Sequence, residues 1–334
     1  MSLYALVSPG GAPGVTTSAV ALALGWPSQV IIAECDPSGG DILAGLFAGH
    51  LPASSGLLPL AVEAGSSADA AALALWHQLI DLDDERSRLL LAGITDPRQA
   101  AALVPSWPAL AAAIAAAPAD VVADCGRLDG APAVEPVLTA ASLAVLVLRP
   151  SLRQVSKARQ RVEILTEILG GRDRLVLLLV GKGPHPAREI GRTLGVAVAA
   201  TLPQDGKTAC LLSDGAGTRR GLATRPLVRA AAAAGRALRG AVPGSGREAA
   251  GDAAPRSWAG PAGVPAASAG LYQGEPVALA AAPIWEQGAA GPPHAAPATQ
   301  PGTEPPAEAP GGWRSADGDP APPGGRAPGH GTSA

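Results

Sequence analysis

The sequence predicts an α/β protein with a doubly wound, mostly parallel sheet of about seven strands, helices on both faces, and a disordered C-terminal tail. Short apolar runs alternate with helical segments over the first 240 residues. These runs are apolar throughout, which is typical of parallel strands that are covered on both faces. Gly, Asp and Thr gather directly after several runs, at the sheet edge where ligands bind in this architecture.

Seven runs rich in Val, Leu, Ile and Ala are the predicted strands, and helical segments lie between them. The strands are residues 3–7, 29–33, 88–94, 121–124, 143–148, 175–180 and 196–201. The clearest helices are residues 16–24, 68–79, 106–117 and 152–169. Ser106 is the expected N-cap of its helix, with Pro108 in the first turn. We expect Trp76, Trp107 and Leu110 to pack in or near the core.

The composition changes near residue 241. The remaining sequence, with segments such as GPPHAAPATQPGTEPPAEAPGG, is dominated by Ala, Gly, Pro and Ser. Such a chain buries too little apolar area to offset about 1 to 2 kcal/mol of backbone entropy lost per ordered residue. We therefore predict one folded domain over residues 1–240 and a disordered tail over residues 241–334.

Charge and composition exclude several classes of protein. The formal net charge of -3 gives no overall attraction to nucleic acid or anionic membrane. Cys35, Cys125 and Cys210 are widely spaced, which indicates reduced thiols and no structural metal site. The N-terminus lacks a signal-peptide pattern, and every apolar stretch is broken before the roughly 20 residues of a membrane span. We expect a cytoplasmic protein.

The segment SPGGAPGVTTS, residues 8–18, joins the first strand to the first helix. Backbone N–H groups and the positive end of the helix dipole converge there, which favours a bound phosphate. Gly10, Gly11 and Gly14 let the backbone approach an anion without a Cβ clash. The hydroxyl of Thr16 is placed to join the Mg²⁺ shell of a bound nucleotide, and Thr17 reinforces the same end.

Two other interpretations fit parts of this loop. Glycines after a strand also form ordinary turns without any ligand. A dinucleotide-binding dehydrogenase is a different class, but GGAPG does not match GxGxxG, and the two threonines would have no purpose there. A nucleotide phosphate remains the best match.

The loop resembles a known family. PGGAPGVTT, residues 9–17, is similar in length and register to the deviant Walker A loop of ParA/MinD ATPases, which reads approximately GKGGVGKTT. VIIAECDPSGGD resembles the family's DxDPQ segment, so Asp36 stands where the family has the carboxylate that orients water and the metal. Glu34 stands at the family's first Asp. VVADCG resembles the Walker B strand, which implies that Asp124 holds Mg²⁺ from behind its direct ligands.

The resemblance covers nearly all of residues 1–240, because VLLLVGKGP and VAVAATLPQD are similar to the family's last core strands. It implies ATP and Mg²⁺ as ligands and a homodimer as the assembly. The binding residues it implies are Gly10, Gly11, Gly14, Val15, Thr16 and Thr17, with Thr16, Asp36 and Asp124 at the metal and Asp36 as the catalytic residue.

Three departures from the family pattern alter these implications. Val15 replaces the phosphate-loop lysine, and Gly10 replaces the signature lysine that family dimers pass to the partner's nucleotide. Because a cation matters most where phosphoryl charge develops, hydrolysis suffers more than binding. Gly181 falls near the family's adenine-reading asparagine, so the base is open. Whether Arg127, Lys182 or Lys207 replaces the missing lysines is also left open.

Loss of the phosphate-loop lysine resembles the TadZ/CpaE branch, whose loops read like GGVGAST and whose members help position pilus or secretion machinery. This resemblance implies an assembly factor with weak or no ATP hydrolysis. Its partner would be a pilus or secretion ATPase or a membrane-associated assembly protein. Through such partners the protein would be located peripherally at the membrane. A chromosome or plasmid partitioning switch is the main alternative. A pseudo-ATPase scaffold and a metabolic member of the same fold are the others.

A basic segment spans residues 219–239. Arg225, Arg229 and Arg236 lie at helical spacing with alanines and leucines opposite, and Arg219 and Arg220 precede them. The simpler interpretation is the last helix of the domain with a solvated basic face. The other is a contact with anionic lipid, nucleic acid or an acidic partner, which the sequence only weakly supports.

Overall fold

The structure is a computed structural model that describes residues 1–11, 13–46, 55–63, 68–96, 98–128, 134–215 and 220–244. The described part of the chain therefore ends just beyond the predicted domain boundary. The predicted tail, apart from its first four residues, lies outside the described residues, as does Arg219.

One eight-stranded sheet organises the described residues. Its spatial order is β3-β4-β2-β5-β1-β6-β7-β8, and every neighbouring pair is parallel except β3 with β4. The strands are β1 (Leu3–Ser8), β2 (Val30–Glu34), β3 (Leu79–Asp81), β4 (Arg88–Leu91), β5 (Asp120–Arg127), β6 (Leu143–Leu148), β7 (Leu175–Val180) and β8 (Ala197–Leu202). The predicted α/β class and the doubly wound, mostly parallel sheet are confirmed.

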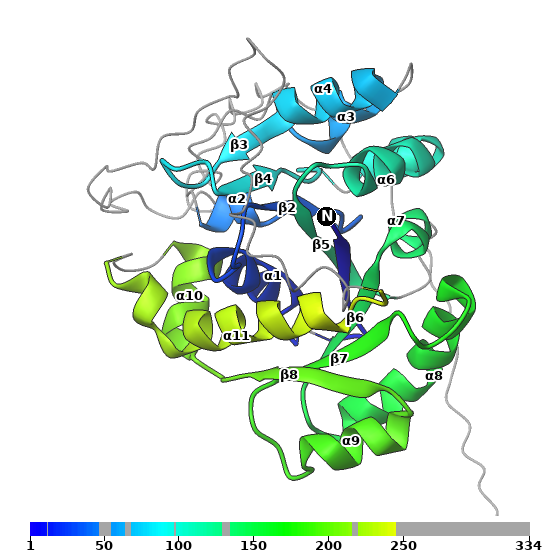
Figure 1. Ribbon diagram of the computed structural model, residues 1–334, viewed down its shortest axis with the longest axis vertical. Coiled ribbons are helices and arrows are strands. Elements are labelled where there is room, and N and C mark those ends of the chain that lie inside the picture. Colours follow the sequence, from blue (N-terminus) through cyan, green and yellow to red (C-terminus); the bar gives the residue numbers. More distant parts are fainter. Residues whose placement is uncertain are drawn as a thin grey trace, which may run out of the picture. The chain divides into compact units, whose positions relative to one another are not determined.

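Helices cover both faces of this sheet (Figure 1). On one face lie α1 (Val15–Leu24), α2 (Ile42–Gly45), α10 (Gly206–Asp214) and α11 (Pro226–Ala241). On the other lie α3 (Leu57–Glu63), α4 (Ala68–Gln78), α5 (Arg98–Leu103), α6 (Trp107–Ala115), α7 (Glu135–Ala140), α8 (Leu152–Leu169) and α9 (Ala187–Leu194). Short 3-10 turns, η1 (Val104–Ser106) and η2 (Leu222–Thr224), precede α6 and α11.

The core consists of two apolar layers, one on each face of the sheet. Tyr4 and Leu6 of β1 face the layer beneath α1 and α11, whereas Leu3, Ala5 and Val7 face the layer beneath α6, α7 and α8. All residues of β1 and β6 are buried. Burial on both faces explains why these strands are continuous apolar runs without alternation.

Most of the observed helix and strand bounds agree closely with the predicted ones, but the strand expected over residues 88–94 ends at Leu91 and the expected cap of α6 is wrong. Ser106 does precede the helix, but its side chain makes no capping hydrogen bond. Its backbone is already helical, at φ -88° and ψ -14°, because the 3-10 turn η1 leads directly into α6. Trp76, Trp107 and Leu110 are buried, as predicted.

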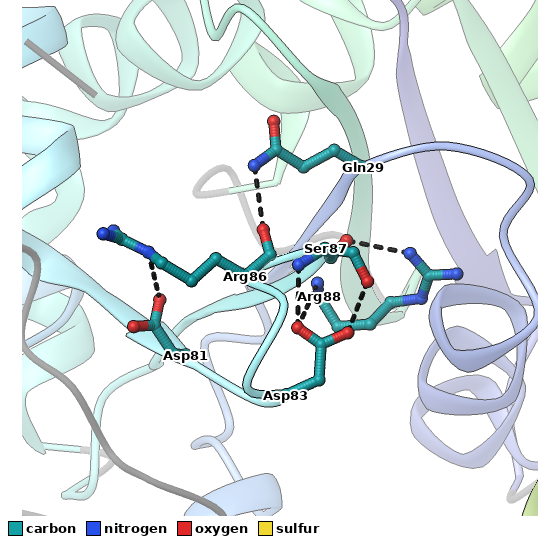
Figure 2. Close-up of polar contacts among 6 residues, drawn as sticks. All are labelled: Gln29, Asp81, Asp83, Arg86, Ser87 and Arg88. Atoms are coloured by element: carbon teal, nitrogen blue, oxygen red, sulfur yellow. Dashed lines mark hydrogen bonds and ion pairs between the residues drawn. The ribbon is translucent and has the colours of Figure 1, made fainter. Parts of the chain in front are cut away.

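One strand, β3, was not predicted from the sequence. It begins at Leu79, which was expected to be the last residue of a helix. Helix α4 ends at Gln78, and the next three residues pair with β4 in an antiparallel hairpin. Figure 2 shows the turn of this hairpin, where the Asp83 carboxylate accepts hydrogen bonds from the backbone N–H of Ser87 at 2.7 Å and of Arg88 at 3.2 Å. The turn thus depends on a short-range carboxylate contact.

Side chains from this hairpin also reach the loop that precedes β2. Gln29 donates its amide to the Arg86 carbonyl at 2.9 Å, and Arg86 forms an ion pair with Asp81 at 3.2 Å (Figure 2). The Arg88 guanidinium donates to the Trp26 carbonyl at 2.6 Å. These contacts fix β3 and β4 at the end of the sheet beside β2.

The topology brings three loops to one edge of the sheet. Strand β5 lies between β1 and β2, and all three are parallel, so their carboxyl ends are neighbours. The loops that follow them begin at Pro9, Cys35 and Leu128.

Across the described part of the chain, every helix is too short or too polar to cross a membrane.

Candidate functional site

A cavity of about 650 Å³ opens at this edge of the sheet, over the loop between β1 and α1. Among the residues that line it are Gly11, Gly14, Val15, Thr16 and Thr17. Five of the six predicted loop residues therefore lie together at one cavity. Gly10, the sixth, is not among the lining residues.

The loop meets the helix at Gly14, which has a left-handed backbone at φ 95° and ψ 48° and precedes the first residue of α1. Gly11 is also left-handed, at φ 75°, and a Cβ there would lie 3.1 Å from the amide nitrogen of Gln154. Side chains at these positions are strained or crowded. Gly14, Val15 and Thr16 line the cavity, so the N-terminus of α1 faces it, as an anion site requires.

Ser8, the last residue of β1, was missed by the sequence interpretation. Its side chain is fully buried, it lines the cavity, and its hydroxyl oxygen has no hydrogen-bond partner among the described residues. An unpaired buried hydroxyl is costly unless something else satisfies it. This group favours a polar ligand at the base of the loop.

The hydroxyl of Thr16 lies near the carboxylate of Asp124 in the second half of β5. The backbone N–H of Gly126 donates to the same carboxylate at 3.0 Å. Asp124 is 2% exposed, and burial, with a smaller contribution from the nearby Asp36, raises its pKa to about 6. A hydroxyl beside a carboxylate provides the hard oxygen donors that Mg²⁺ prefers.

Asp36 lines the cavity from the end of β2. One of its carboxylate oxygens accepts the backbone N–H of Ser38 at 2.8 Å. The other lies against β5, because a Cβ at Gly126 would be only 1.9 Å from it. The fold thus brings together the three residues predicted at the metal, Thr16, Asp36 and Asp124, from three different elements.

Glu34 lies behind the cavity and is not among its lining residues. It is 3% exposed and accepts the backbone N–H of Ile42 at 2.8 Å and of Gly93 at 3.0 Å. Burial is the main cause that raises its pKa to about 7. The carboxyl therefore connects the end of β2 to the first residue of α2 and to the loop that follows β4.

Two further acidic residues line the cavity, Asp41 before α2 and Asp214 at the end of α10. The GGD that follows the second strand in the sequence was a signal for Asp41. No local signal pointed to Asp214, which reaches the cavity only because α10 packs beside α1 and α2.

Helix α8 contacts the phosphate loop from outside the cavity. Gln154, which is buried, donates its side-chain amide to the Gly10 carbonyl at 3.0 Å. A Cβ at Gly10 would lie 3.9 Å from Nζ of Lys157. Residues 144 positions apart in sequence meet here, so sequence patterns alone did not indicate this contact.

The three cations left open by the sequence are placed differently. Arg127 lines the cavity, whereas Lys182 and Lys207 are exposed and do not line it. Gly181, which falls near the family's adenine-reading asparagine, donates its N–H to the Leu202 carbonyl at 2.8 Å and also does not line the cavity.

The basic segment ends in α11, whose apolar face is buried against the sheet and α1. Arg229 and Arg236 are exposed on this helix. Arg225, which directly precedes the first residue of the helix, is half-buried. Arg239 lies 3.4 Å from a carboxylate oxygen of Asp120. The predicted helix with an exposed basic face is present, and contact of that face with lipid, nucleic acid or an acidic partner stays a prediction.

The sequence matches no protein-family model and no curated protein. The structure resembles the MinD cell division protein of Aquifex aeolicus, with 18% identity, a TM-score of 0.52, and coverage of 72% of this chain and 98% of that chain.

Two other solved structures are similar to the same degree. A ParA family ATPase from Chlorobium tepidum has 16% identity and a TM-score of 0.54, over 69% of this chain and 97% of that chain. The septum site-determining protein MinD of Pyrococcus horikoshii, complexed with Mg-ADP, has 17% identity and a TM-score of 0.54, over 70% and 94%. The chain therefore has the fold of ParA/MinD-type P-loop ATPases.

Proposed function

We propose that this protein binds Mg²⁺ and ATP in the cavity over the phosphate loop and acts as a positioning or assembly factor, with weak or no hydrolysis. The observation that carries the proposal is the meeting of the N-terminus of α1 with the Thr16–Asp124 pair at one cavity. The unpaired hydroxyl of Ser8 and the fold of a MinD that was solved with Mg-ADP add support.

Each residue has a proposed role in that site. Backbone N–H groups of the loop and of the first turn of α1 bind phosphate oxygens. Thr16 and Asp124 hold Mg²⁺, which when bound supplies positive charge at the phosphates. Asp36 orients water beside them. Hydrolysis is expected to be weak because neither Val15 nor Gly10 supplies a cation where charge develops.

A partitioning switch is the second candidate, and the retained carboxylates favour it. Asp36 and Asp124 lie side by side at the site, as a hydrolysing enzyme would need. The two candidates differ in turnover and in genetic neighbourhood. A neighbouring gene for a secretion-type hexameric ATPase would favour the pilus or secretion assembly factor, acting with that ATPase or a membrane-associated partner. A ParB-like neighbour would favour partitioning.

Calorimetric titration with ATP, ADP and GTP tests the binding itself. We expect a dissociation constant in the micromolar to millimolar range, or about -4 to -8 kcal/mol, that depends on Mg²⁺. Thr16→Ala should remove most of the Mg²⁺ dependence, whereas Thr166→Ala, on α8 away from the cavity lining, should leave it unchanged. Absence of heat with every nucleotide at millimolar concentration would eliminate the proposed ligand.

The substitution Val15→Lys tests whether the loop between β1 and α1 binds the phosphates of ATP. Val15 is the first residue of α1 and lines the cavity, so a lysine there is placed to reach phosphate oxygens. We expect ATP binding to tighten by about 1.5 to 3 kcal/mol, the range for a charge-assisted hydrogen bond. Asp124→Ala in the same background should weaken the Mg²⁺-dependent part of binding. Titration calorimetry measures both effects.

Val15→Met is the matched control, because it adds length without charge. Equal affinities for the lysine and methionine variants would mean that the loop does not cradle phosphate. Hydrolysis should stay near background in Val15→Lys, since Gly10 still leaves the loop without its second cation. Rapid hydrolysis by the unmodified protein would contradict the proposed weak turnover.

A further inference from the structure

The charges around the cavity are unbalanced for a polyphosphate ligand. Three carboxylates line it, those of Asp36, Asp41 and Asp214, and Asp124 lies directly behind. Among the described lining residues, Arg127 is the only cation. A nucleoside triphosphate bound in this cavity would therefore lie near one guanidinium and several acidic groups.

The end of β5 places Arg127 at the base of the phosphate loop. Arg127 is the last residue of β5 and pairs in register with Ser8, the last residue of β1. The next N–H, that of Leu128, donates to the Ser8 carbonyl at 2.9 Å. The backbone of Arg127 is therefore held beside the first residue of the loop.

The preceding residue directs the chain to this position. Gly126 has a left-handed backbone at φ 62°, and a Cβ there would collide with Asp36. The strand therefore turns at a position where only glycine fits, two residues after Asp124 and directly before Arg127. Arg127 itself is exposed and makes no hydrogen bond or ion pair through its side chain with any described residue.

We propose that Arg127 supplies a positive charge that binds the phosphates of the bound nucleotide, a binding contact that Gly10 and Val15 cannot make, without replacing the loop lysines in hydrolysis. This inference rests on the proposed nucleotide binding at the same cavity. Guanidinium is always charged and binds phosphate oxygens with two parallel N–H donors, so it suits a triphosphate at this edge.

Lys157 is the rival cation. Its ammonium lies near Gly10, above the loop, and it comes from the exposed face of α8. It is not among the residues that line the cavity, and the side-chain amide of Gln154, one turn earlier, already donates to the Gly10 carbonyl at 3.0 Å. Lining the cavity favours Arg127 over Lys157.

The experiment measures affinity for fluorescent ATP with Mg²⁺ at two salt concentrations. Arg127→Gln is expected to weaken binding by about 10-fold or more and to reduce its salt dependence, since a charge-assisted contact is lost. Arg127→Lys should recover part of the affinity. Arg159→Gln removes the same charge from an exposed position on α8 that does not line the cavity, and should bind ATP like the unmodified protein.

Two results would overturn the assignment. If the unmodified protein binds ATP and Arg127→Gln binds it equally well, the proposed function stands and the role of Arg127 is wrong. If Lys157→Gln alone weakens binding, the cation comes from α8. An unmodified protein that binds no nucleotide would remove the proposed function and this inference together. Unchanged thermal unfolding of each variant shows that its fold is intact.

Discussion

Between pH 4.5 and 7, the unmodified protein should lose up to about 3 kcal/mol of unfolding free energy relative to a Glu34→Gln variant. Burial raises the pKa of Glu34 from 4.5 in the unfolded chain to about 7 in the folded one. The folded state therefore binds more protons in this window, and its stability falls as pH rises. The contribution of Glu34 is fully present below pH 4.5 and is lost as pH passes 7.

Urea denaturation at a series of pH values measures this difference. Subtracting the variant removes the similar contribution of Asp124, whose pKa of about 6 has the same sign. Glutamine keeps one acceptor for the N–H groups of Ile42 and Gly93, so the variant is expected to fold. A difference that rises with pH would mean that the folded protein stabilises ionised Glu34.

Asp120→Ala should lower the free energy of unfolding by about 2 to 4 kcal/mol, because it removes a buried acceptor and one partner of an ion pair. Asp120 is 4% exposed at the start of β5. It accepts the indole N–H of Trp26 at 3.0 Å and the backbone N–H of Ser2 at 3.0 Å, and it pairs with Arg239 of α11. The indole of Trp26 would be left buried without a partner.

Two variants calibrate this effect in urea denaturation. Asp120→Asn keeps an acceptor but no charge, so its loss of stability should be smaller. Glu163→Ala removes a carboxylate from an exposed pair with Arg172, and should leave the unfolding transition nearly unchanged. Equal transitions for Asp120→Ala and Glu163→Ala would show that the buried carboxylate does not hold α11 and Trp26 to the sheet.

The sequence was sufficient to predict most of the sheet, because most strands coincide with an apolar run of neighbouring residues. Residues 143–148 and 175–180 are continuous apolar runs, and the structure has strands with those bounds. Residues 79–81 were different. Three residues between a helix and a turn carry no pattern of their own, and their pairing with β4 depends on the turn that Asp83 closes.

Part of the candidate site could also be predicted from residues that are close together in the sequence. Gly11, Gly14 and Thr16 lie within six residues of one another, so a strand followed by a helix is enough to bring them together. Their convergence with Asp36 and Asp124 was predictable from the parallel order of strand ends. Glu34 was not: its position two residues before Asp36 gave no indication that it lies behind the cavity and not on its surface.

By itself, therefore, the sequence determined the α/β class, the glycine-rich loop between the first strand and the first helix, and the lack of lysines in that loop. Only the tertiary structure decided which distant groups meet that loop: Arg127 beside Ser8, Gln154 against Gly10, and Asp214 across the cavity. The physical reason is the range of the interactions. Apolar periodicity and glycine conformation act over a few residues, whereas contacts between side chains far apart in sequence depend on how β5, α8 and α10 pack.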